Sequence, residues 1–383
     1  TGDVDGDIEQ LNVVSSDKID VKTLEANATG SLSITDVNNI IDELGAFSLG
    51  DALTVEAKGR TSGLLLTGDV SATAVTIKTG LNSGGTDGIL ALKDLDITST
   101  SGDITLAGRG ITQSSGSTVT SAGKILILGS DFSDGTVGAN VNLAGTLTAA
   151  STASDSIVFD DINNLTLPNL EAGTAGNRGG LRLGTGANRS GLGPTFIIGA
   201  IDQAAGTSIK VGQVDAYQSG GAITLDSTTN EIDSLDEIRR GGALTVVDKA
   251  DGLSVTGNIT EGTDANAVTL ETPGLLDLNS ANIEASGLSF TSGTALGATQ
   301  TALTSSAGGF FDGRRGVGDI VIDAGGRDVS MFGRLLNTSN SDRIVIQNAN
   351  DVAVGRMDVN SSTGTIELGT AANPITGDVT RNV

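Results

Sequence analysis

Acidic residues at alternate positions near the amino terminus are the first group whose type and spacing could do chemistry. Asp3, Asp5 and Asp7 lie in the sequence DVDGDIE. Carboxylate oxygens are the ligands that Ca²⁺ prefers, so these three residues are candidate Ca²⁺ ligands. The EF-hand pattern fails, because Ile8 stands where that loop needs Gly and Val14 where it needs Glu. The alternative is an exposed acidic turn, and we expect no cofactor apart from Ca²⁺ at this place.

Two further groups of carboxylates invite comparison with enzymes that cleave polysaccharides. The sequence FDGRRG places Asp312 beside Arg314 and Arg315, and a carboxylate base next to arginines suits a sugar acid. Asp160 and Asp161 are adjacent, and glycoside hydrolases need two or three carboxylates in one cleft. The simpler interpretations are a salt-bridged loop for the first group and outward-facing turn positions for the second. We favour these simpler interpretations.

The residue types that are missing exclude several kinds of site. The chain has no His and no Cys. It therefore has no Ser-His-Asp triad, no imidazole or thiolate metal site and no disulfide. The Gly-Thr-Gly run at Gly184 does not open a helix, so it is no phosphate-binding loop. Arg239 and Arg240 are better explained as a pair between coils than as an anion site. We predict a protein that is not an enzyme and has no catalytic residues.

The charge of the chain also limits its partners. With 22 Lys and Arg against 46 Asp and Glu, the net charge is −24. A surface of one acidic sign repels nucleic acid and anionic membranes. No run of about 18 apolar residues is present, so we expect no membrane insertion. The sequence begins at Thr1 and not at Met, which indicates a processed or excised segment.

The elements that must position these residues are short strands. Apolar and polar residues alternate in stretches such as Gly102–Leu106 (GDITL) and Lys124–Leu128 (KILIL). This period of two is typical of strands with one buried face. Aromatic residues make up only 2% of the chain, which suits a thin core of stacked aliphatic side chains better than a thick globular core.

Long repeats indicate how the strands are arranged. Residues 30–55 align without a gap with residues 221–246, and residues 155–172 align in the same way with residues 342–359. Identity falls on Gly, Asn, Asp and aliphatic positions, as expected of repeated structural units. A shorter module, an aliphatic pair followed by an acid and a Gly-bearing turn, begins at Ile19, Leu165, Ile209 and Val352.

Asparagines recur at equivalent turn positions of these repeats. Asn39 corresponds to Asn230, and Asn163 corresponds to Asn350. Such residues could form side-chain ladders between neighbouring coils. Direct tandem repeats, small aliphatic residues and recurring Asn favour coils that stack on one another over a sandwich of hairpins.

We therefore predict an all-β protein, a right-handed parallel β-helix or β-solenoid. At roughly 20 residues per coil it would have roughly 15–19 coils. The handedness follows from the rule for parallel crossovers. We assign residues 1–383 to a single elongated domain with irregular loops near 173–208 and 292–318.

The repeats resemble those of bacterial exoproteins of the filamentous-haemagglutinin type. The likeness lies in phrases such as INNLTLPNLEA from Ile162, NDVAVGRMDV from Asn350 and SGDITLAGRGITQ from Ser101, and it covers most of the chain. The resemblance implies a secreted β-helical protein used in adhesion, biofilm formation or competition between cells. The amino-terminal secretion module of that family is not recognisable, and Asn373-Pro374 does not replace it.

The resulting hypothesis is a structural protein, extracellular or on the bacterial cell surface. It would act as a filament subunit or adhesin shaft that associates with itself end to end, or with flanking domains of a larger exoprotein. We expect self-association through the terminal coils, near Leu11–Val21 and Ile366–Val379, with Ile19, Val21, Ile366 and Ile375 as the candidate residues. The alternatives are a β-helix that binds or cleaves polysaccharide, and an adhesin that binds a surface glycan or receptor.

Overall fold

The computed structural model describes residues 11–12, 19–35, 39–57, 63–79, 88–129, 139–185, 197–217, 220–249, 252–261, 266–296, 300–313, 318–337, 342–359 and 362–381. These residues form β-strands and no helix, and the strands build a parallel β-solenoid of about 13 turns. The predicted all-β solenoid is confirmed, whereas its right-handed sense stays a prediction. Nor do these ranges contain a helix long and apolar enough to cross a membrane.

The chain divides into two compact units, Thr1–Ala200 and Ile201–Val383, which are described one at a time. The boundary falls within the stretch 173–208, for which the sequence predicts irregular structure. The assignment of all 383 residues to one domain stays a prediction.

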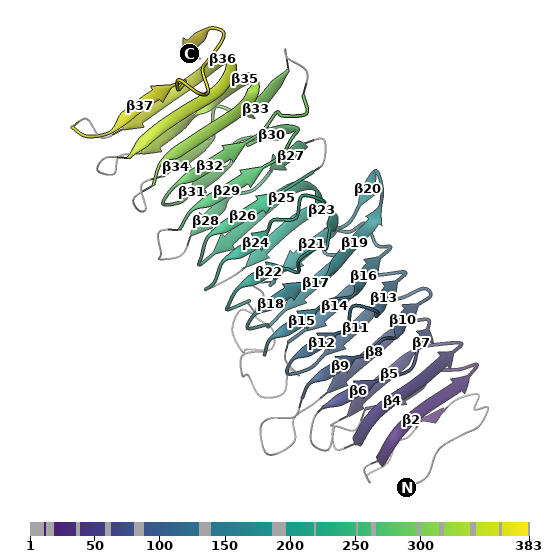
Figure 1. The fold of residues 1–383 in the computed structure, drawn as a ribbon. Helices are drawn as coiled ribbons and strands as arrows, with labels where there is room; N and C mark the ends of the chain where they lie inside the picture. The colour runs from purple at the N-terminus through teal and green to yellow at the C-terminus, as the bar shows by residue number, and fades with distance from the viewer. Residues whose placement is uncertain are drawn as a thin grey trace. The chain divides into compact units, whose positions relative to one another are not determined.

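Unit 1 has three faces, each a stack of parallel strands (Figure 1). Face A consists of β1 (Leu11–Asn12), β3 (Leu32–Ile34), β5 (Leu53–Ala57), β8 (Val75–Thr79), β11 (Ile104–Ala107), β14 (Ile125–Leu128), β17 (Ile157–Asp160) and β21 (Gly180–Leu183). Face B consists of the first halves of β2 (Asp20–Ala28) and β4 (Ile40–Leu49), then β6 (Leu64–Leu66), β9 (Leu90–Leu92), β12 (Ile111–Gln113), β15 (Val141–Leu143) and β18 (Leu165–Leu167). Face C consists of the second halves of β2 and β4, then β7 (Val70–Ala72), β10 (Asp96–Ser99), β13 (Thr118–Ser121), β16 (Thr146–Ala149) and β19 (Asn169–Thr174).

Unit 2 also has three faces of parallel strands, named D, E and F. Face D consists of β22 (Ile201–Gln203), β24 (Ile223–Leu225), β26 (Leu244–Val247), β29 (Val268–Glu271), β32 (Leu288–Thr291), the starts of β35 (Ile320–Asn337) and β36 (Arg343–Val359), and β37 (Thr365–Leu368). Face E consists of the first halves of β23 (Ile209–Tyr217) and β25 (Glu231–Arg240), β27 (Gly252–Val255), β30 (Leu275–Asp277), β33 (Thr301–Ser305), the middles of β35 and β36, and β38 (Val379–Arg381). Face F consists of the second halves of β23 and β25, β28 (Ile259–Glu261), β31 (Asn282–Glu284), β34 (Phe310–Asp312) and the ends of β35 and β36.

The turns are fewer than predicted, because several are longer than 20 residues. Leu32 stacks on Leu53 with short corners between them. Ile125 stacks on Ile157, and Leu288 stacks on Ile320, after a longer connection leaves the coil. The periodicity of the strands does not reveal these insertions, which add residues to a turn without adding a turn. The prediction of 15–19 coils was therefore too high.

The core of each unit is a set of aliphatic columns. On face D, Ile223, Leu244, Val268, Leu288 and Ile320 follow one another in register, and all of them are buried. Each side chain is covered by the equivalent residues of the turns before and after it. Full burial of one such side chain is worth about 1.5–3 kcal/mol, so the columns stabilise the coil turn by turn.

The first long repeat produces the same elements in both units. β3, β4 and β5 of unit 1 correspond to β24, β25 and β26 of unit 2. The buried Asn39 accepts a hydrogen bond from the backbone N–H of Ile19 at 2.9 Å, and Asn230 accepts one from Ile209 at 2.9 Å. At these two positions Asn thus joins neighbouring turns through a backbone group. Asn163 also joins them through side chains, as predicted, since its amide donates to the side chain of Asn140 on the preceding turn at 3.1 Å.

The second long repeat preserves an unusual backbone conformation. Asp161 has φ +55° and Asn348, its equivalent, has φ +49°. Asp and Asn tolerate this left-handed region better than other residues with a Cβ atom. The next residue forms a single parallel bridge in both copies, Ile162 with Ile197 and Ala349 with Ile375. The repeat therefore encodes a corner of the coil.

The irregular loops predicted near 173–208 and 292–318 stay a prediction, although regular strands lie within both stretches. A short antiparallel hairpin of β19 and β20 (Asn177–Arg178) leaves unit 1, but β21 returns to face A. Within 292–318, β33 and β34 are regular strands of unit 2. Two inward residues suffice for a strand of the coil. Such short strands are difficult to recognise in a sequence when the residues around them are rich in Gly and Ser.

A buried ion pair replaces apolar packing at one position of unit 2. Arg240 corresponds to Leu49 in the repeat, and its side chain and that of Glu261 on the next turn are fully buried, 3.4 Å apart. The guanidinium also donates to the carbonyl groups of Gly242 at 2.5 Å and Glu284 at 2.8 Å. The interpretation of Arg240 as a residue that pairs between coils is confirmed.

We expect Arg240→Leu to lower the stability of unit 2, because it leaves the carboxylate of Glu261 buried without its cation. Loss of one partner of a buried pair costs about 3–5 kcal/mol. The double variant Arg240→Leu/Glu261→Met removes both charges and should recover much of this loss. Thermal unfolding of the three proteins measures the effect, and equal midpoints for the single and double variants would contradict it.

Candidate self-association site at the carboxyl-terminal turn

Among the described residues, the last turn of unit 2 has strands on two of its three faces. It adds β37 to face D and β38 to face E, each in parallel with β36. On face F, the end of β36 at Arg356–Val359 has β35 on one side, and no described strand follows it on the other. Faces D and E of unit 2 therefore extend one described strand further along the coil than face F.

The apolar columns of unit 2 end uncovered at this turn. Ile366 is 41% exposed, Leu368 40% and Val379 48%, although all three continue columns of buried residues. Their partners one turn earlier, Ile344, Ile346 and Val352, are buried. Covering these side chains would remove apolar area from water, which makes them candidates for an interaction surface.

The backbone of the last turn is also open. Among the described strands, β37 and β38 pair with β36 alone. A strand at the edge of a sheet presents unpaired N–H and C=O groups that can accept a strand from another chain. Apolar columns and backbone edge are thus open on the same side of the last turn.

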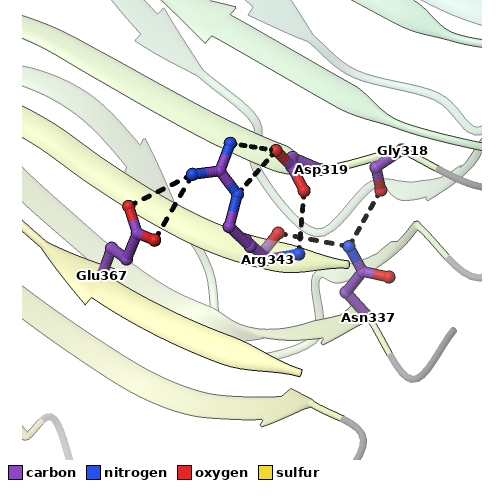
Figure 2. Close-up of polar contacts among 5 residues, drawn as sticks. All are labelled: Gly318, Asp319, Asn337, Arg343 and Glu367. Atoms are coloured by element: carbon purple, nitrogen blue, oxygen red, sulfur yellow. Dashed lines mark hydrogen bonds and ion pairs between the residues drawn. The ribbon is translucent and has the colours of Figure 1, made fainter. Parts of the chain in front are cut away.

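A charged network fastens β37 to the turns before it (Figure 2). The guanidinium of Arg343 lies between two carboxylates, 2.6 Å from Asp319 and 3.3 Å from Glu367. Asp319 and then Glu367 raise the pKa of Arg343 through hydrogen bonds and charge. The side chain of Asn337 donates to the carbonyl groups of Gly318 at 3.0 Å and Arg343 at 3.2 Å. These contacts hold three successive turns in register at the outer surface of face D.

A second network lies at the outer surface of face F. The carboxylate of Asp358 accepts from Arg334 at 2.5 Å and from Arg356 at 3.0 Å, and these two arginines are neighbours in register. Burial raises the pKa of Asp358, but the hydrogen bonds and charges of Arg334 and Arg356 outweigh it, and the pKa lies below its ordinary value. Asp358 is therefore ionised at neutral pH and joins β36 to β35.

The first turn of unit 1 presents the other candidate end. Within the described part of the chain, β2 pairs with β4 alone, so its other edge has no described partner. Val21 lies in register with Ile41, and Ile19 is half-buried beside Asn39. Lys22 is exposed, and no ion pair joins it to another described residue.

The residues predicted for self-association therefore lie on two terminal turns. Ile366 is exposed at the open end of unit 2, and Ile375 is half-buried at its bridge to Ala349. Leu368 and Val379 lie in the predicted stretch Ile366–Val379 but were not singled out, and they extend the same apolar columns. Register alignment of TIEL with RIVI could have identified Leu368, because it places that residue beside Ile346.

The structure gives little support to the other residues predicted as candidates for metal binding or catalysis. Asp3, Asp5 and Asp7 lie outside the described residues, as do Arg314 and Arg315. Asp312 is buried at the end of β34. In the described ranges, no group of three or more acidic residues is arranged to hold a metal ion.

The outward position expected for Asp160 is wrong. Its side chain is buried, and it accepts hydrogen bonds from the hydroxyl of Thr185 at 2.8 Å and the backbone N–H of Asp161 at 3.1 Å. Asp160 thus binds polar groups of a coil corner. Arg239, by contrast, is exposed and pairs with Glu237 of its own strand at 2.7 Å.

Comparisons with known proteins name no relative of this chain. No family model matches it, and the searches found no match among curated proteins or solved structures. The β-helical repeat architecture is established by the structure, and the filamentous-haemagglutinin type stays a hypothesis.

We expect Asp358→Asn to destabilise the last turns at neutral pH and to have a smaller effect in acid. The folded pKa of Asp358 is lowered, so its ionised form contributes stability at neutral pH, and this is lost as the pH falls through the lowered pKa. Thermal unfolding of both proteins between pH 7 and about pH 2.5 tests this, because carboxyl groups of Asp titrate near pH 4 when unperturbed. A difference in midpoint that is constant across this range would contradict the assignment.

Proposed function

We propose that the protein is a structural β-solenoid, extracellular or on a bacterial surface, that serves as a filament subunit or adhesin shaft and associates with itself end to end. The observation that carries this proposal is the open last turn, where Ile366, Leu368 and Val379 are exposed at the ends of buried columns. A second copy placed on this turn would continue both the aliphatic columns and the backbone ladder. Head-to-tail contacts of this type do not close and therefore build filaments.

The charge distribution supports association at the ends over association through the sides. Charged side chains lie at the outer surfaces of the turns and pair between turns, as Lys78 with Glu56 and Lys124 with Asp155 do, both at 2.7 Å. The net charge of −24 makes the sides of two copies repel each other. The end of unit 2 offers apolar side chains and backbone groups instead.

A second candidate function is the binding of an acidic polysaccharide on face F. Arg239 lies 5.3 Å from the ring centre of Tyr217, and Arg334 lies 5.7 Å from that of Phe310. Such pairs of an arginine and an aromatic residue suit sugar acids, since the cation can neutralise the carboxylate. Retardation of the protein in gels that contain polygalacturonate, and its loss in Arg334→Gln, would favour this function.

We expect Ile366→Asp to abolish end-to-end association, because a carboxylate would have to be buried in an apolar column. Ile375→Asp and Ile19→Asp should weaken it as well. The matched control is Ile89→Asp, since Ile89 is 40% exposed but lies in unit 1 away from both terminal turns. Electron microscopy and sedimentation velocity across a range of concentrations measure the assembly.

The expected result is fibres that lengthen with concentration for the wild-type protein and Ile89→Asp, and isolated particles for Ile366→Asp. Wild-type particles that stay single at every concentration would contradict self-association and would favour a flanking domain as the cover of the open turn.

A further inference from the structure

Two oxygen atoms at one corner of unit 2 are buried without a hydrogen-bond partner. The corner is the one at which face F leads into face D, between Asn337 at the end of β35 and Asp342 directly before β36. Asn337 is fully buried, and Asp342 is 7% exposed. Neither Oδ1 of Asn337 nor Oδ2 of Asp342 accepts a hydrogen bond from a described residue. Buried polar atoms nearly always have a partner, so two such oxygens at one corner point to a bound group.

The backbone fixes the orientation of the Asn337 amide. Its nitrogen donates to the carbonyl groups of Gly318 at 3.0 Å and Arg343 at 3.2 Å. A flip of the amide would turn its oxygen toward these two carbonyl oxygens, so the oxygen lies on the other side, as Figure 2 shows. Because Arg343 directly follows Asp342, the amide is held beside the backbone from which the Asp342 side chain projects.

The side chain of Asp342 lies on the inner side of the coil. Ile344, two residues later, is buried in a column of face D, whereas the side chain of Arg343 between them is 46% exposed. Side chains alternate along extended chain, so Asp342 shares the inner side with Ile344, in agreement with its burial. On the turn before, Gly313 and Gly318 lie beside Asn337 and offer backbone groups but no side chain.

A carboxylate in this position needs a positive charge, because a buried charge without a partner is costly. No ion pair joins Asp342 to another described residue. The guanidinium of the adjacent Arg343 is engaged at the outer surface, 2.6 Å from Asp319 and 3.3 Å from Glu367. The charge that balances Asp342 therefore has to come from outside this set of side chains.

An earlier turn of unit 2 has a cation at the same corner. Arg240 ends the strand of face F in that turn, as Asn337 does in β35. Its buried guanidinium pairs with Glu261 and donates to the carbonyl groups of Gly242 and Glu284. The inside of this corner can thus hold a cation among oxygen atoms. In the turn of Asn337 a neutral amide stands at the end of the strand, while Asp342 supplies a carboxylate.

We propose that Oδ1 of Asn337 and the carboxylate of Asp342 bind a Ca²⁺ ion at this corner. Ca²⁺ takes about six to eight oxygen ligands from carboxylates, Asn side chains, backbone carbonyl groups and water, and it accepts irregular geometry, whereas Mg²⁺ demands a nearly ideal octahedron. The net charge of −24 concentrates cations around the protein. This site lies inside unit 2 and does not depend on end-to-end association.

Calcium binding and stability of the Asp342→Asn variant test the site. Equilibrium dialysis of the chelator-treated full chain at neutral pH measures Ca²⁺ binding, and thermal unfolding is followed with chelator, with Ca²⁺ and with Mg²⁺ at equal concentration. The matched control is Asp155→Asn, because Asp155 is the equivalent of Asp342 in the second long repeat but pairs with Lys124 at 2.7 Å.

The wild-type protein and Asp155→Asn should unfold at a higher temperature in Ca²⁺ than in Mg²⁺. Asp342→Asn should lose this difference, and its Ca²⁺ affinity at the site should fall at least about tenfold, since loss of even an outer-shell partner costs about 10–100-fold in metal affinity. Equal effects of Ca²⁺ and Mg²⁺ on the wild-type protein would indicate screening of the net charge alone and would overturn the proposal. A Ca²⁺ effect that persists in Asp342→Asn would place the ion elsewhere and overturn it too.

Stability in chelator gives a second measurement with the opposite sign. Without Ca²⁺, Asp342→Asn should be at least as stable as the wild-type protein, because it removes a buried charge and its new amide can donate to Oδ1 of Asn337. A lower unfolding midpoint of this variant in chelator, or a failure to fold, would show that the carboxylate stabilises the corner without a cation. Either result would contradict the Ca²⁺ site.

Discussion

Each turn of a parallel β-solenoid depends on its neighbours, because a single turn can bury neither its aliphatic side chains nor its backbone groups. In the described strands, inward residues such as Leu244, Val268 and Leu288 are covered from both sides, and their backbone groups bond to the turns before and after. The same dependence explains why the last turn stands out. Its residues continue the columns, but Ile366, Leu368 and Val379 are covered from one side only.

Polar residues fix the register of the turns, whereas apolar residues supply most of the stability. Asn39 and Asn230 bind the backbone of the preceding turn, and Arg343 joins three turns at the outer surface of face D. The buried pair of Arg240 and Glu261 is a local exception, in which a cation and a carboxylate fill a position that the repeat elsewhere gives to Leu49. An acidic chain without His or Cys can thus be ordered by its apolar columns while Ile366, Leu368 and Val379 of its last described turn stay exposed.

Much of the fold could be predicted from the sequence because successive turns of a coil place similar residues at equivalent positions. The alignment of residues 30–55 with 221–246 identified matching strands in both units, and the period of two identified inward residues such as Ile104 and Leu106. The number of turns could not be predicted, since insertions such as the one between Ile125 and Ile157 leave the columns unchanged. The short strand Phe310–Asp312 was missed for a related reason, because its one fully buried residue, Phe311, gives too short a pattern to recognise.

The candidate site was predicted only in outline. An apolar residue at a terminal coil, Ile366, could be named from the repeat pattern, but Leu368, Val379 and the network around Arg343 depend on register between turns. A buried residue such as Asp160 also looks like an exposed acid in the sequence, because its partner Thr185 comes from the neighbouring turn. Residues that touch on neighbouring turns are far apart in the sequence. Which residues meet depends on the lengths of the connections between the strands, and the sequence pattern does not give these lengths.

The central claim is that the open last turn is covered by another copy of the chain, and amide hydrogen exchange at that turn tests it most directly. Exchange of the backbone amides of Thr365–Leu368 and Val379–Arg381 is measured in dilute protein and at concentrations that favour assembly. The account predicts fast exchange of the amides on the free edge in dilute protein and strong protection on assembly, with little change in the inner strands. Exchange at these two strands that does not depend on concentration would contradict the claim.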